Sequence, residues 1–271
     1  MTTLDLYNNI LEAKIFFILG PCVLDTQENA EAIADKLVKM KRKYKVPFIF
    51  KASFDKANRQ SVDSYRGVSF ERSREIMKSI KKEYSLPLIT DIHESRQAEL
   101  VKDFADIIQI PAFLCRQTDL LLAAGKTDAI VNIKKGQFVS VDQMGDSIKK
   151  VQSTGNNKVM LTERGTFFGY GDLVVDFRNI MKMTNLNVPV IFDATHSVQR
   201  PGGKGNTSGG EREYVKPLAC AALEFGAKGI FMEVHPKPET ALCDGPNSLD
   251  FEMLEHTVAE IMKRIKEVHN V

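Results

Sequence analysis

Short apolar segments alternate with longer amphipathic segments along the whole chain, and this alternation limits the fold more than any other feature. The apolar segments carry mostly β-branched or aromatic residues, as strands buried on both faces do. Parallel neighbours in a sheet need a crossover connection, which the amphipathic segments supply. The sequence therefore predicts a parallel α/β sheet. Its strands are expected within residues 14–22, 47–54, 86–93, 105–111, 129–136, 158–165, 189–196 and 229–236.

The intervening segments carry helix signals. Asp25 and Glu28 predict a capping box at the start of the first helix. Residues 218–223 have helical periodicity that stops at Gly226. Further helices are expected over 69–84, 95–103, 173–185 and 249–268, with weaker patterns over 119–125 and 143–153.

Strands and crossovers of this kind fit a closed (β/α)₈ barrel or an open doubly wound sheet. No glycine fingerprint of the dinucleotide or Walker type follows the first strand, which argues against the open sheet. A length of 271 residues is usual for one barrel. We therefore expect a single (β/α)₈ TIM-barrel catalytic domain over residues 1–271, with residues 1–13 as a cap on the bottom of the barrel.

Composition argues against several classes of protein. The formal net charge is only +2, with basic and acidic residues mixed along the helices, so no nucleic-acid partner is expected. The apolar segments are too short to span a membrane, and no secretory signal is recognised. The four cysteines are scattered without paired spacing. This usage is typical of reduced thiols, and a cytoplasmic location is expected.

Polar side chains stand at the end of every predicted strand. In a closed parallel barrel these ends share one face, where barrel enzymes have their active sites. One polar strand end can serve a turn or a helix cap, but polar groups at all eight ends, with charges of both signs among them, predict an active site. The residues are Cys22, Lys51, Ser53, Asp91, His93, Gln109, Asn132, Lys134, Glu163, Arg164, Asp193, His196, Glu233 and His235.

Basic residues gather around this predicted face, and they indicate what binds there. Lysine and arginine in a partly dry cleft recognise phosphate and carboxylate through charge-assisted hydrogen bonds. For each residue alone, a solvated surface charge is the alternative. Lys51 and Lys134 interrupt or end apolar strands, and a buried lysine without an anion is costly. Anionic, phosphorylated substrates are therefore expected beside Lys51, Lys56, Arg59, Arg116, Lys134 and Arg164.

A second group of residues has the chemistry of a metal site. Cys22, His196 and Glu233 end strands that become neighbours when the barrel closes, and Asp244 follows in the next loop. One sulfur, one imidazole nitrogen and two carboxylates suit Zn²⁺, Fe²⁺ or Mn²⁺. No compact local motif marks the site, so packing of Cys22 and a binding or general-acid role for His196 stay open on the residues alone.

The segment PGGKGNTSGG at 201–210 is long for a barrel connection, and half of it is glycine. Within residues 197–213 it predicts a mobile lid that excludes water from the active site. A flexible loop without this role is the alternative.

Several of these segments together resemble 3-deoxy-D-manno-octulosonate 8-phosphate synthases of the metal-dependent class, from about residue 14 onward. KANRQS at 56–61 is the most specific element, because the related aldoheptulosonate phosphate synthases usually carry a KPRTS-like sequence there. The other segments are GPC (20–22), TDIHE (90–94), QIPAFLCRQTDLL (109–121), KKGQFVS (134–140), TERGTFFGY (162–170), FDATHSVQ (192–199) and ALCDGP (241–246).

The resemblance implies condensation of phosphoenolpyruvate with D-arabinose 5-phosphate and water, giving 3-deoxy-D-manno-octulosonate 8-phosphate and phosphate for lipopolysaccharide synthesis. It places catalysis at Lys56, Asn58, Asp91, Lys134, His196 and Asp244. Phosphoenolpyruvate would contact Lys56, Lys134 and Arg164 in a pocket shaped by Gln109, Pro111, Ala112 and Gln137. The sugar phosphate would contact Lys51, Ser53, Asn58, Asp91 and Arg59, with Arg116 supplied by a neighbouring subunit of a homotetramer.

The same resemblance bears on the metal. Metal-dependent members carry cysteine at the position of Cys22 and metal-independent members carry asparagine, while His196, Glu233 and Asp244 match the other ligand positions. The tripeptide that begins at Cys243 is shared at least in part with the metal-independent class, so a strict metal requirement stays open.

Three rival functions remain. An aldoheptulosonate phosphate synthase would use erythrose 4-phosphate. A Schiff-base aldolase would use Lys51 or Lys134 as an amine nucleophile. A non-catalytic barrel would bind sugar phosphates as a sensor.

Overall fold

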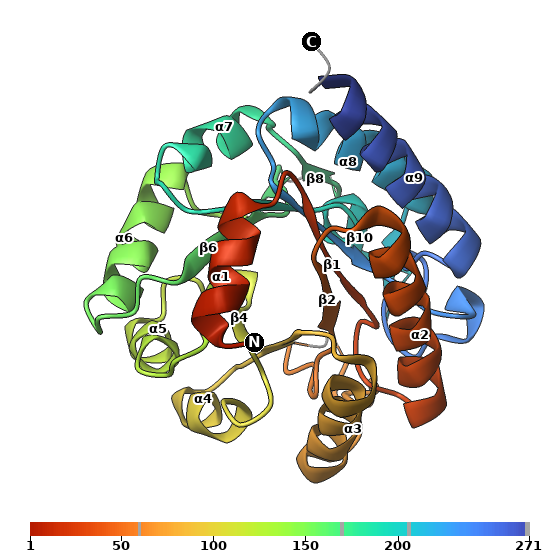
Figure 1. The fold of residues 1–271 in the computed structure, drawn as a ribbon, viewed down its shortest axis with the longest axis horizontal. Helices are drawn as coiled ribbons and strands as arrows, with labels where there is room; N and C mark the ends of the chain where they lie inside the picture. The colour runs from red at the N-terminus through yellow and green to blue at the C-terminus, as the bar shows by residue number, and fades with distance from the viewer. Residues whose placement is uncertain (59–60, 169–170, 205–206, 269–271) are drawn as a thin grey trace.

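The computed structural model describes residues 1–58, 61–168, 171–204 and 207–268 and contains a closed barrel of eight parallel strands (Figure 1). The strands pair in the order β1-β12-β9-β6-β5-β4-β3-β2. Each lies within one predicted apolar segment, so the (β/α)₈ prediction is confirmed and the open sheet is wrong. They are β1 (Phe16–Gly20), β2 (Phe48–Lys51), β3 (Leu88–Asp91), β4 (Ile107–Ile110), β5 (Ile130–Lys134), β6 (Val159–Glu163), β9 (Val190–Asp193) and β12 (Gly229–Glu233).

Helices surround the barrel and cover its outer face (Figure 1). Short 3₁₀ turns follow several strands: η1 (Ala112–Leu114), η2 (His196–Val198), η3 (Arg212–Tyr214) and η4 (Pro238–Thr240). The outer helices are α2 (Gln27–Tyr44), α3 (Phe70–Tyr84), α4 (Ser95–Val101), α5 (Thr118–Gly125), α6 (Val141–Gln152), α7 (Arg178–Thr184), α8 (Val215–Glu224) and α9 (Phe251–Val268).

Two local predictions about helix starts are wrong. Thr26, not Asp25, caps α2, and its hydroxyl accepts a hydrogen bond from the Asn29 N–H at 3.1 Å. The helix expected from residue 173 begins only at Arg178, because Leu173–Val174 form strand β8, which pairs with β7 (Thr166–Phe167). Val174 and Val175 are β-branched and favour extended backbone. Asp176 follows them, and its side chain accepts a hydrogen bond from the Arg178 N–H in a turn.

The interior of the barrel changes from apolar to polar along seven of its eight strands, the exception being β1, which ends at Gly20. Alternate side chains of a strand point to the same face. One apolar residue or more from each strand therefore meets the others in an inner cluster, including Ile49, Ile89, Ile107, Ile130 and Ile191. Two positions further along, the inward side chains are polar: Lys51, Asp91, Gln109, Asn132 and Asp193, with Thr162 and Glu233 following the same rule. The sequence thus builds one barrel whose interior is apolar at the amino ends of the strands and polar at their carboxyl ends.

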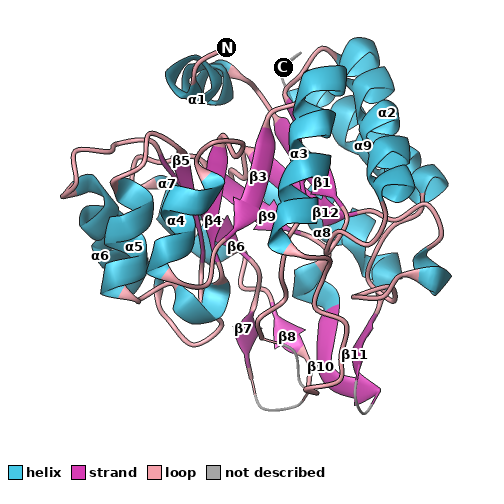
Figure 2. Ribbon diagram, turned by 90° about the horizontal axis from the view of Figure 1, so that it is seen from below, coloured by secondary structure: helices cyan, strands magenta, loops and turns pink. Residues whose placement is uncertain are grey.

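Helix α1 (Thr3–Glu12), within the segment expected to act as a cap, lies across the apolar end of the barrel (Figure 2). Leu6, Tyr7 and Ile10 pack into the inner apolar cluster. The Tyr7 hydroxyl donates a hydrogen bond to the Val159 carbonyl at 3.0 Å. Burial of the ring raises the pKa of Tyr7, which keeps the hydroxyl a donor at neutral pH.

Tyr7→Phe is expected to lower the free energy of unfolding by about 1 kcal/mol, because it removes one buried hydrogen bond and leaves the Val159 carbonyl without it. Turnover should not change, since the ring lies at the end opposite the polar face. Urea unfolding followed by circular dichroism measures the change. Leu4→Ala, on an exposed position of the same helix, is the control. Equal losses in the two variants would contradict a specific role for the Tyr7 hydrogen bond.

Two antiparallel pairs extend from the other end of the barrel (Figure 2). One is β7 with β8, and the other is β10 (Gln199–Lys204) with β11 (Thr207–Gly210). The second pair makes up most of the predicted lid, of which residues 205–206 lie outside the described residues. Within the described part of the chain, no helix has both the length and the apolar character needed to cross a membrane.

Candidate active site

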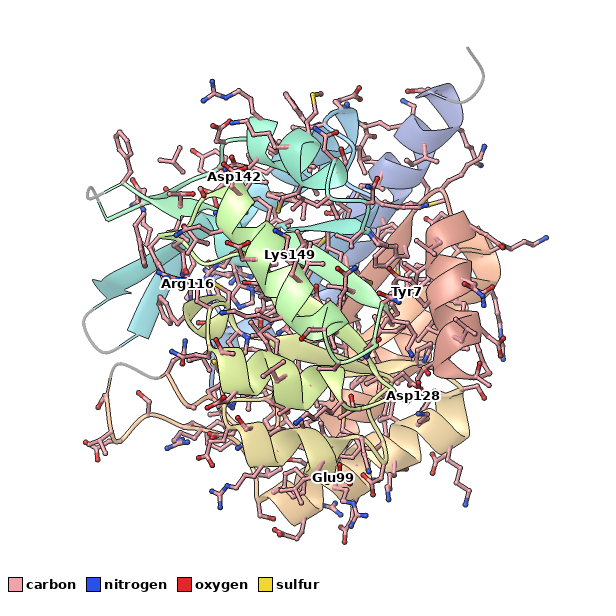
Figure 3. All side chains as sticks on the ribbon, turned by 90° about the vertical axis from the view of Figure 1, so that its left-hand side faces the viewer. Tyr7, Glu99, Arg116, Asp128, Asp142 and Lys149 are labelled. Carbon is pink, nitrogen blue, oxygen red and sulfur yellow. The ribbon has the colours of Figure 1, made fainter. Side chains whose placement is uncertain are left out.

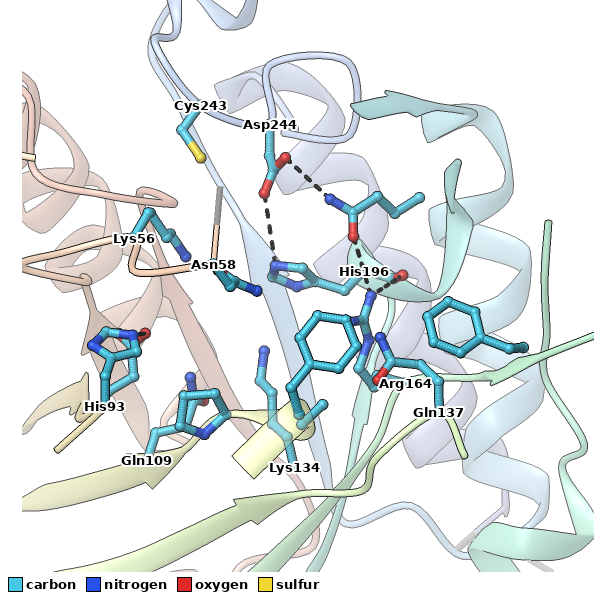
Figure 4. Close-up of a pocket in the computed structure, with 16 residues that line it drawn as sticks. Lys56, Asn58, His93, Gln109, Lys134, Gln137, Arg164, His196, Cys243 and Asp244 are labelled. Atoms are coloured by element: carbon cyan, nitrogen blue, oxygen red, sulfur yellow. Dashed lines mark hydrogen bonds and ion pairs between the residues drawn. The ribbon is translucent and has the colours of Figure 1, made fainter. Parts of the chain in front are cut away.

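A polar pocket of about 250 Å³ opens at the carboxyl ends of the strands (Figure 4). Many of the predicted site residues meet there although they come from distant segments. The lining residues are Lys56, Asn58, Asp91, His93, Gln109, Pro111, Ala112, Phe113, Lys134, Gln137, Arg164, Phe167, His196, Gln199, Cys243 and Asp244.

Lys134 stands on the floor of this pocket. Its ammonium lies 2.6 Å from Asp193 Oδ2 and 3.9 Å from the centre of the Phe231 ring. Burial lowers the pKa of Lys134, although the adjacent Asp193 carboxylate opposes this effect. Burial alone would raise the pKa of Asp193, but His196 and Lys134 hold it well below its usual range. Asp193 is therefore a carboxylate that pairs with Lys134, and the side-chain nitrogen of Lys134 also faces the pocket.

Arg164 forms a second buried cation on the same wall. One guanidinium nitrogen, Nη2, donates to the His196 carbonyl at 2.9 Å and to Gln199 Oε1 at 3.1 Å. Its Nε is buried and has no hydrogen-bond partner among the described residues. A buried donor without an acceptor is costly, so the guanidinium is suited to a ligand that supplies one.

Lys56 and His93 lie on the opposite wall (Figure 4), and Asp91, which also lines the pocket, contacts His93. The Asp91 carboxylate lies 3.2 Å from His93 Nε2. Burial alone would raise the pKa of Asp91, but His93, Lys56 and Lys51 hold it well below its usual range. Burial opposes the charge on Lys56, yet the nearby Cys22 sulfur and the Asp91 and Glu233 carboxylates raise its pKa well above normal. Both groups are therefore charged at neutral pH.

Some predicted substrate residues lie outside the pocket lining. Lys51 is below it, with 1% of its surface exposed, and donates to the Cys22 carbonyl at 2.7 Å and to Glu233 at 3.3 Å. Ser53 is also fully buried. Arg116 is exposed on the surface near the hairpin end of the molecule, far from Tyr7 (Figure 3). Arg59 lies outside the described residues.

The structure brings His196 to two of the predicted metal-binding carboxylates. His196 Nε2 lies 3.3 Å from Glu233 Oε1 and 4.0 Å from Asp244 Oδ2. On the other side of the ring, Nδ1 lies 2.8 Å from Asp193 Oδ2. A carboxylate behind a histidine restrains the ring orientation, as it does in many metal centres. This arrangement leaves Nε2 to face an ion.

Cys22 approaches the same carboxylate from the other side. Its Sγ lies 3.3 Å from Asp244 Oδ2 and 2.7 Å from the sulfur of Cys243. The potential ligand atoms therefore form two overlapping groups that share Asp244, one with Cys22 and Cys243 and one with His196 and Glu233.

The chemistry of these donors fits a divalent transition metal. Sulfur, imidazole nitrogen and carboxylate oxygen are the donors that Zn²⁺ and related ions take. Glu233 Oε2 is buried and lacks a hydrogen-bond partner within the described part of the chain. The cations Lys51 and Lys56 and the His196 ring hold the pKa of Glu233 well below its usual range in spite of burial, so it is a carboxylate.

Four features of the site were not assigned a role from the sequence. Asp193 and His93 were recognised only as strand-end residues. Gln199 links Asp244 to Arg164, because its Nε2 donates to Asp244 Oδ1 at 3.1 Å while its Oε1 accepts from the guanidinium. Phe113 and Phe167 stack at the pocket rim with ring centres 6.3 Å apart. No local pattern distinguishes these two from other exposed aromatic residues.

Known proteins resemble this chain over most of its length. A sequence model described as the DAHP synthetase I family matches residues 11–270. The chain belongs to this family. Among its relatives, a 2-dehydro-3-deoxyphosphooctonate aldolase of Desulfatibacillum aliphaticivorans is 51% identical and covers 96% of each chain. Proteins of the same name from Syntrophotalea carbinolica and Rickettsia prowazekii are 50% and 48% identical, over 92% and 93% of this chain and 90% and 92% of theirs. The resemblance to the octulosonate phosphate enzymes is confirmed, while membership of the metal-dependent class stays a prediction.

Proposed function

We propose that this family member condenses phosphoenolpyruvate with D-arabinose 5-phosphate and water, giving 3-deoxy-D-manno-octulosonate 8-phosphate and phosphate. The observation that carries the proposal is the pair of buried cations, Lys134 and Arg164, in one pocket with the Asp244 and His196 side chains. The names of the relatives favour the octulosonate over the heptulosonate reaction, which the family model alone does not separate.

The two walls of the pocket suit two phosphorylated substrates side by side. Lys134 and Arg164 would bind the carboxylate and phosphate of phosphoenolpyruvate, with Gln109, Pro111, Ala112 and Gln137 shaping its place. Asn58 and Asp91 would face the sugar, and Lys56, from the same wall, would also contact phosphoenolpyruvate. Cations on several sides offset the repulsion between the anions and hold the reacting carbons together.

Bond formation joins the enol carbon of phosphoenolpyruvate to the aldehyde carbon of the sugar. Water adds to the neighbouring carbon, and the C–O bond to phosphate then breaks, so the bridging oxygen leaves with phosphate. A metal held by Cys22, His196, Glu233 and Asp244 would supply Lewis-acid polarisation of a bound oxygen. Asp244 and His196 would hold or move the protons of the water and of the new hydroxyl. Lys51 and Ser53, below the pocket, would support the sugar site.

Turnover in ¹⁸O-labelled water tests this type of reaction. If the C–O bond breaks, the released phosphate carries no solvent oxygen, and mass spectrometry of phosphate shows only the unlabelled species. Incorporation of one ¹⁸O atom into phosphate would mean attack at phosphorus, and it would contradict the proposal. Borohydride trapping of substrate on Lys51 or Lys134 would instead support the Schiff-base alternative.

Asp193→Asn is expected to weaken divalent-metal affinity by roughly 10- to 100-fold, because it weakens the contact that orients His196. Competition with a chromophoric chelator measures the affinity directly. Asp176→Asn, which changes a carboxylate paired with Arg178 on the outside of the barrel, is the control. Unchanged affinity in Asp193→Asn would mean that the Asp193 contact does not support metal binding by His196.

The hairpin of β10 and β11 would act as the lid of this site. Its first residue, Gln199, touches Asp244 and Arg164, and the next, Arg200, lies 2.7 Å from Asp172 in the loop before β8. After β11, Arg212 donates to the carbonyl groups of Gly245 and Pro246, beside Asp244. Closure of the lid would therefore act on the anion-binding guanidinium and on a metal-binding carboxylate together.

We further place the reaction in a cytoplasmic homotetramer. Arg116 is exposed and does not line the pocket of its own chain. This position fits the expectation that Arg116 contacts the sugar phosphate bound in a neighbouring subunit. Arg59 would contact the sugar phosphate bound in its own subunit. Phe113 and Phe138 are about half exposed nearby, at 45% and 54%, and would be covered by such a neighbour. Four cysteines kept as thiols suit the reducing cytoplasm.

A further inference from the structure

Two cysteine sulfurs lie against each other at the edge of the candidate metal site. Cys22 follows β1 and Cys243 lies in a loop beyond β12, and these two strands pair along their whole length. The sulfurs are 2.7 Å apart although the residues are separated by 221 positions in sequence. A disulfide bond requires about 2.05 Å, so a small rotation about the side-chain bonds would bring the sulfurs within bonding distance.

We propose that Cys22 and Cys243 form a reversible oxidation site, in which an intramolecular disulfide replaces the metal. A sulfur in a disulfide is no longer a thiolate and cannot serve as a metal ligand. Oxidation would thus remove Cys22 from the site that it shares with Asp244. The loss of turnover on oxidation rests on the metal assignment made above, whereas formation of the disulfide does not.

Access to the pair limits the kind of oxidant. Cys243 lines the active-site pocket, whereas Cys22 is not among the lining residues. Both side chains are almost fully buried, with 4% and 5% of their surfaces exposed. A small neutral oxidant such as hydrogen peroxide can therefore reach Cys243 through the pocket, while a bulky disulfide cannot.

The oxidation balances in two steps. The Cys243 sulfur attacks one oxygen of peroxide, the O–O bond breaks, and the other oxygen leaves as water with the thiol proton. This step leaves a sulfenic acid. The Cys22 sulfur then attacks that sulfur, the S–O bond breaks, and a second water carries away the remaining proton. Two thiols and one peroxide become one disulfide and two waters.

The other two cysteines serve as internal controls. Cys115 lies beside the backbone of Gly136, and Cys220 lies in α8 next to Arg264. Neither is in contact with the Cys22–Cys243 pair. Both should keep their thiols under mild oxidation.

Peptide mapping after peroxide treatment tests the proposal on the full chain. Chelated protein should lose two thiols per chain, yield a linked peptide pair containing residues 22 and 243, and regain both thiols with dithiothreitol. Protein loaded with Zn²⁺ should form the link several-fold more slowly. Retention of all thiols, linkage through Cys115 or Cys220, or sulfinic acid at Cys243 without a link would overturn the proposal. Equal rates with and without Zn²⁺ would overturn the competition between metal and disulfide.

A second test measures the activity of wild type and of Cys243→Ser before and after peroxide. Each protein is compared with its activity before peroxide. Wild type should lose activity on peroxide treatment and recover most of it with dithiothreitol. Cys243→Ser should lose much less of its activity, because peroxide enters the pair through Cys243 and Cys22 does not line the pocket. Equal losses in the two proteins would contradict the proposal, and mapping of wild type alone decides if the variant does not fold.

Discussion

Lys134→Met is expected to lower kcat/KM for phosphoenolpyruvate by about 10²- to 10³-fold, as loss of one preorganised charge-stabilising donor does in a dry active site. Lys134 is only 6% exposed, and its ammonium is the cation on the pocket floor. Steady-state kinetics with phosphoenolpyruvate varied and the sugar saturating measures the change.

The Lys134 variant needs a control for folding. Removing the lysine leaves the buried Asp193 carboxylate with less compensating charge, and breaking a buried pair costs about 3–5 kcal/mol of stability. The double variant Lys134→Met with Asp193→Asn removes both charges, so it should recover stability without recovering activity. Lys158 precedes β6 and forms an ion pair with the exposed Asp128. Lys158→Met breaks this pair and should leave turnover unchanged. A stable double variant with near-normal kcat/KM would show that Lys134 does not bind substrate.

Cys22→Ala is expected to lose bound metal and turnover together while it stays folded. Its sulfur is the one thiol among the four residues proposed as ligands, and borderline-soft ions favour such a donor. Metal analysis of the purified variant, and turnover before and after dialysis against a chelator, measure both effects. Cys220→Ala, which removes a buried sulfur in α8, is the matched control for packing. Full activity and full metal content in Cys22→Ala would mean that Cys22 only packs.

The barrel and most of the pocket could be predicted because the direction of a side chain in a strand depends only on its position along that strand. A lysine two positions after the inward Ile49, or an aspartate two positions after the inward Ile89, must point into the same interior. Parallel pairing then brings all such residues to one face. Helix starts were less predictable, because Asp25 could have capped α2 but instead contacts His235 from a neighbouring strand end.

Contacts between loops could not be predicted in the same way. The bridge from Arg164 through Gln199 to Asp244 depends on how the hairpin begins, and Cys22 meets Cys243 only because a loop after β12 turns back over β1. Nor did the sequence show that Asp193 holds both Lys134 and His196. Each of these contacts joins two segments whose separation in the sequence follows neither helical nor strand periodicity.

Phosphate release from phosphoenolpyruvate with either of two sugars tests the proposed function most directly. With D-arabinose 5-phosphate, phosphate should appear together with an equal amount of an eight-carbon sugar acid phosphate, identified by its mass. With D-erythrose 4-phosphate, release should be far slower at equal concentrations. Preference for erythrose 4-phosphate would assign the chain to the heptulosonate reaction, and tight binding of both substrates without phosphate release would mean that this barrel binds sugar phosphates without condensing them.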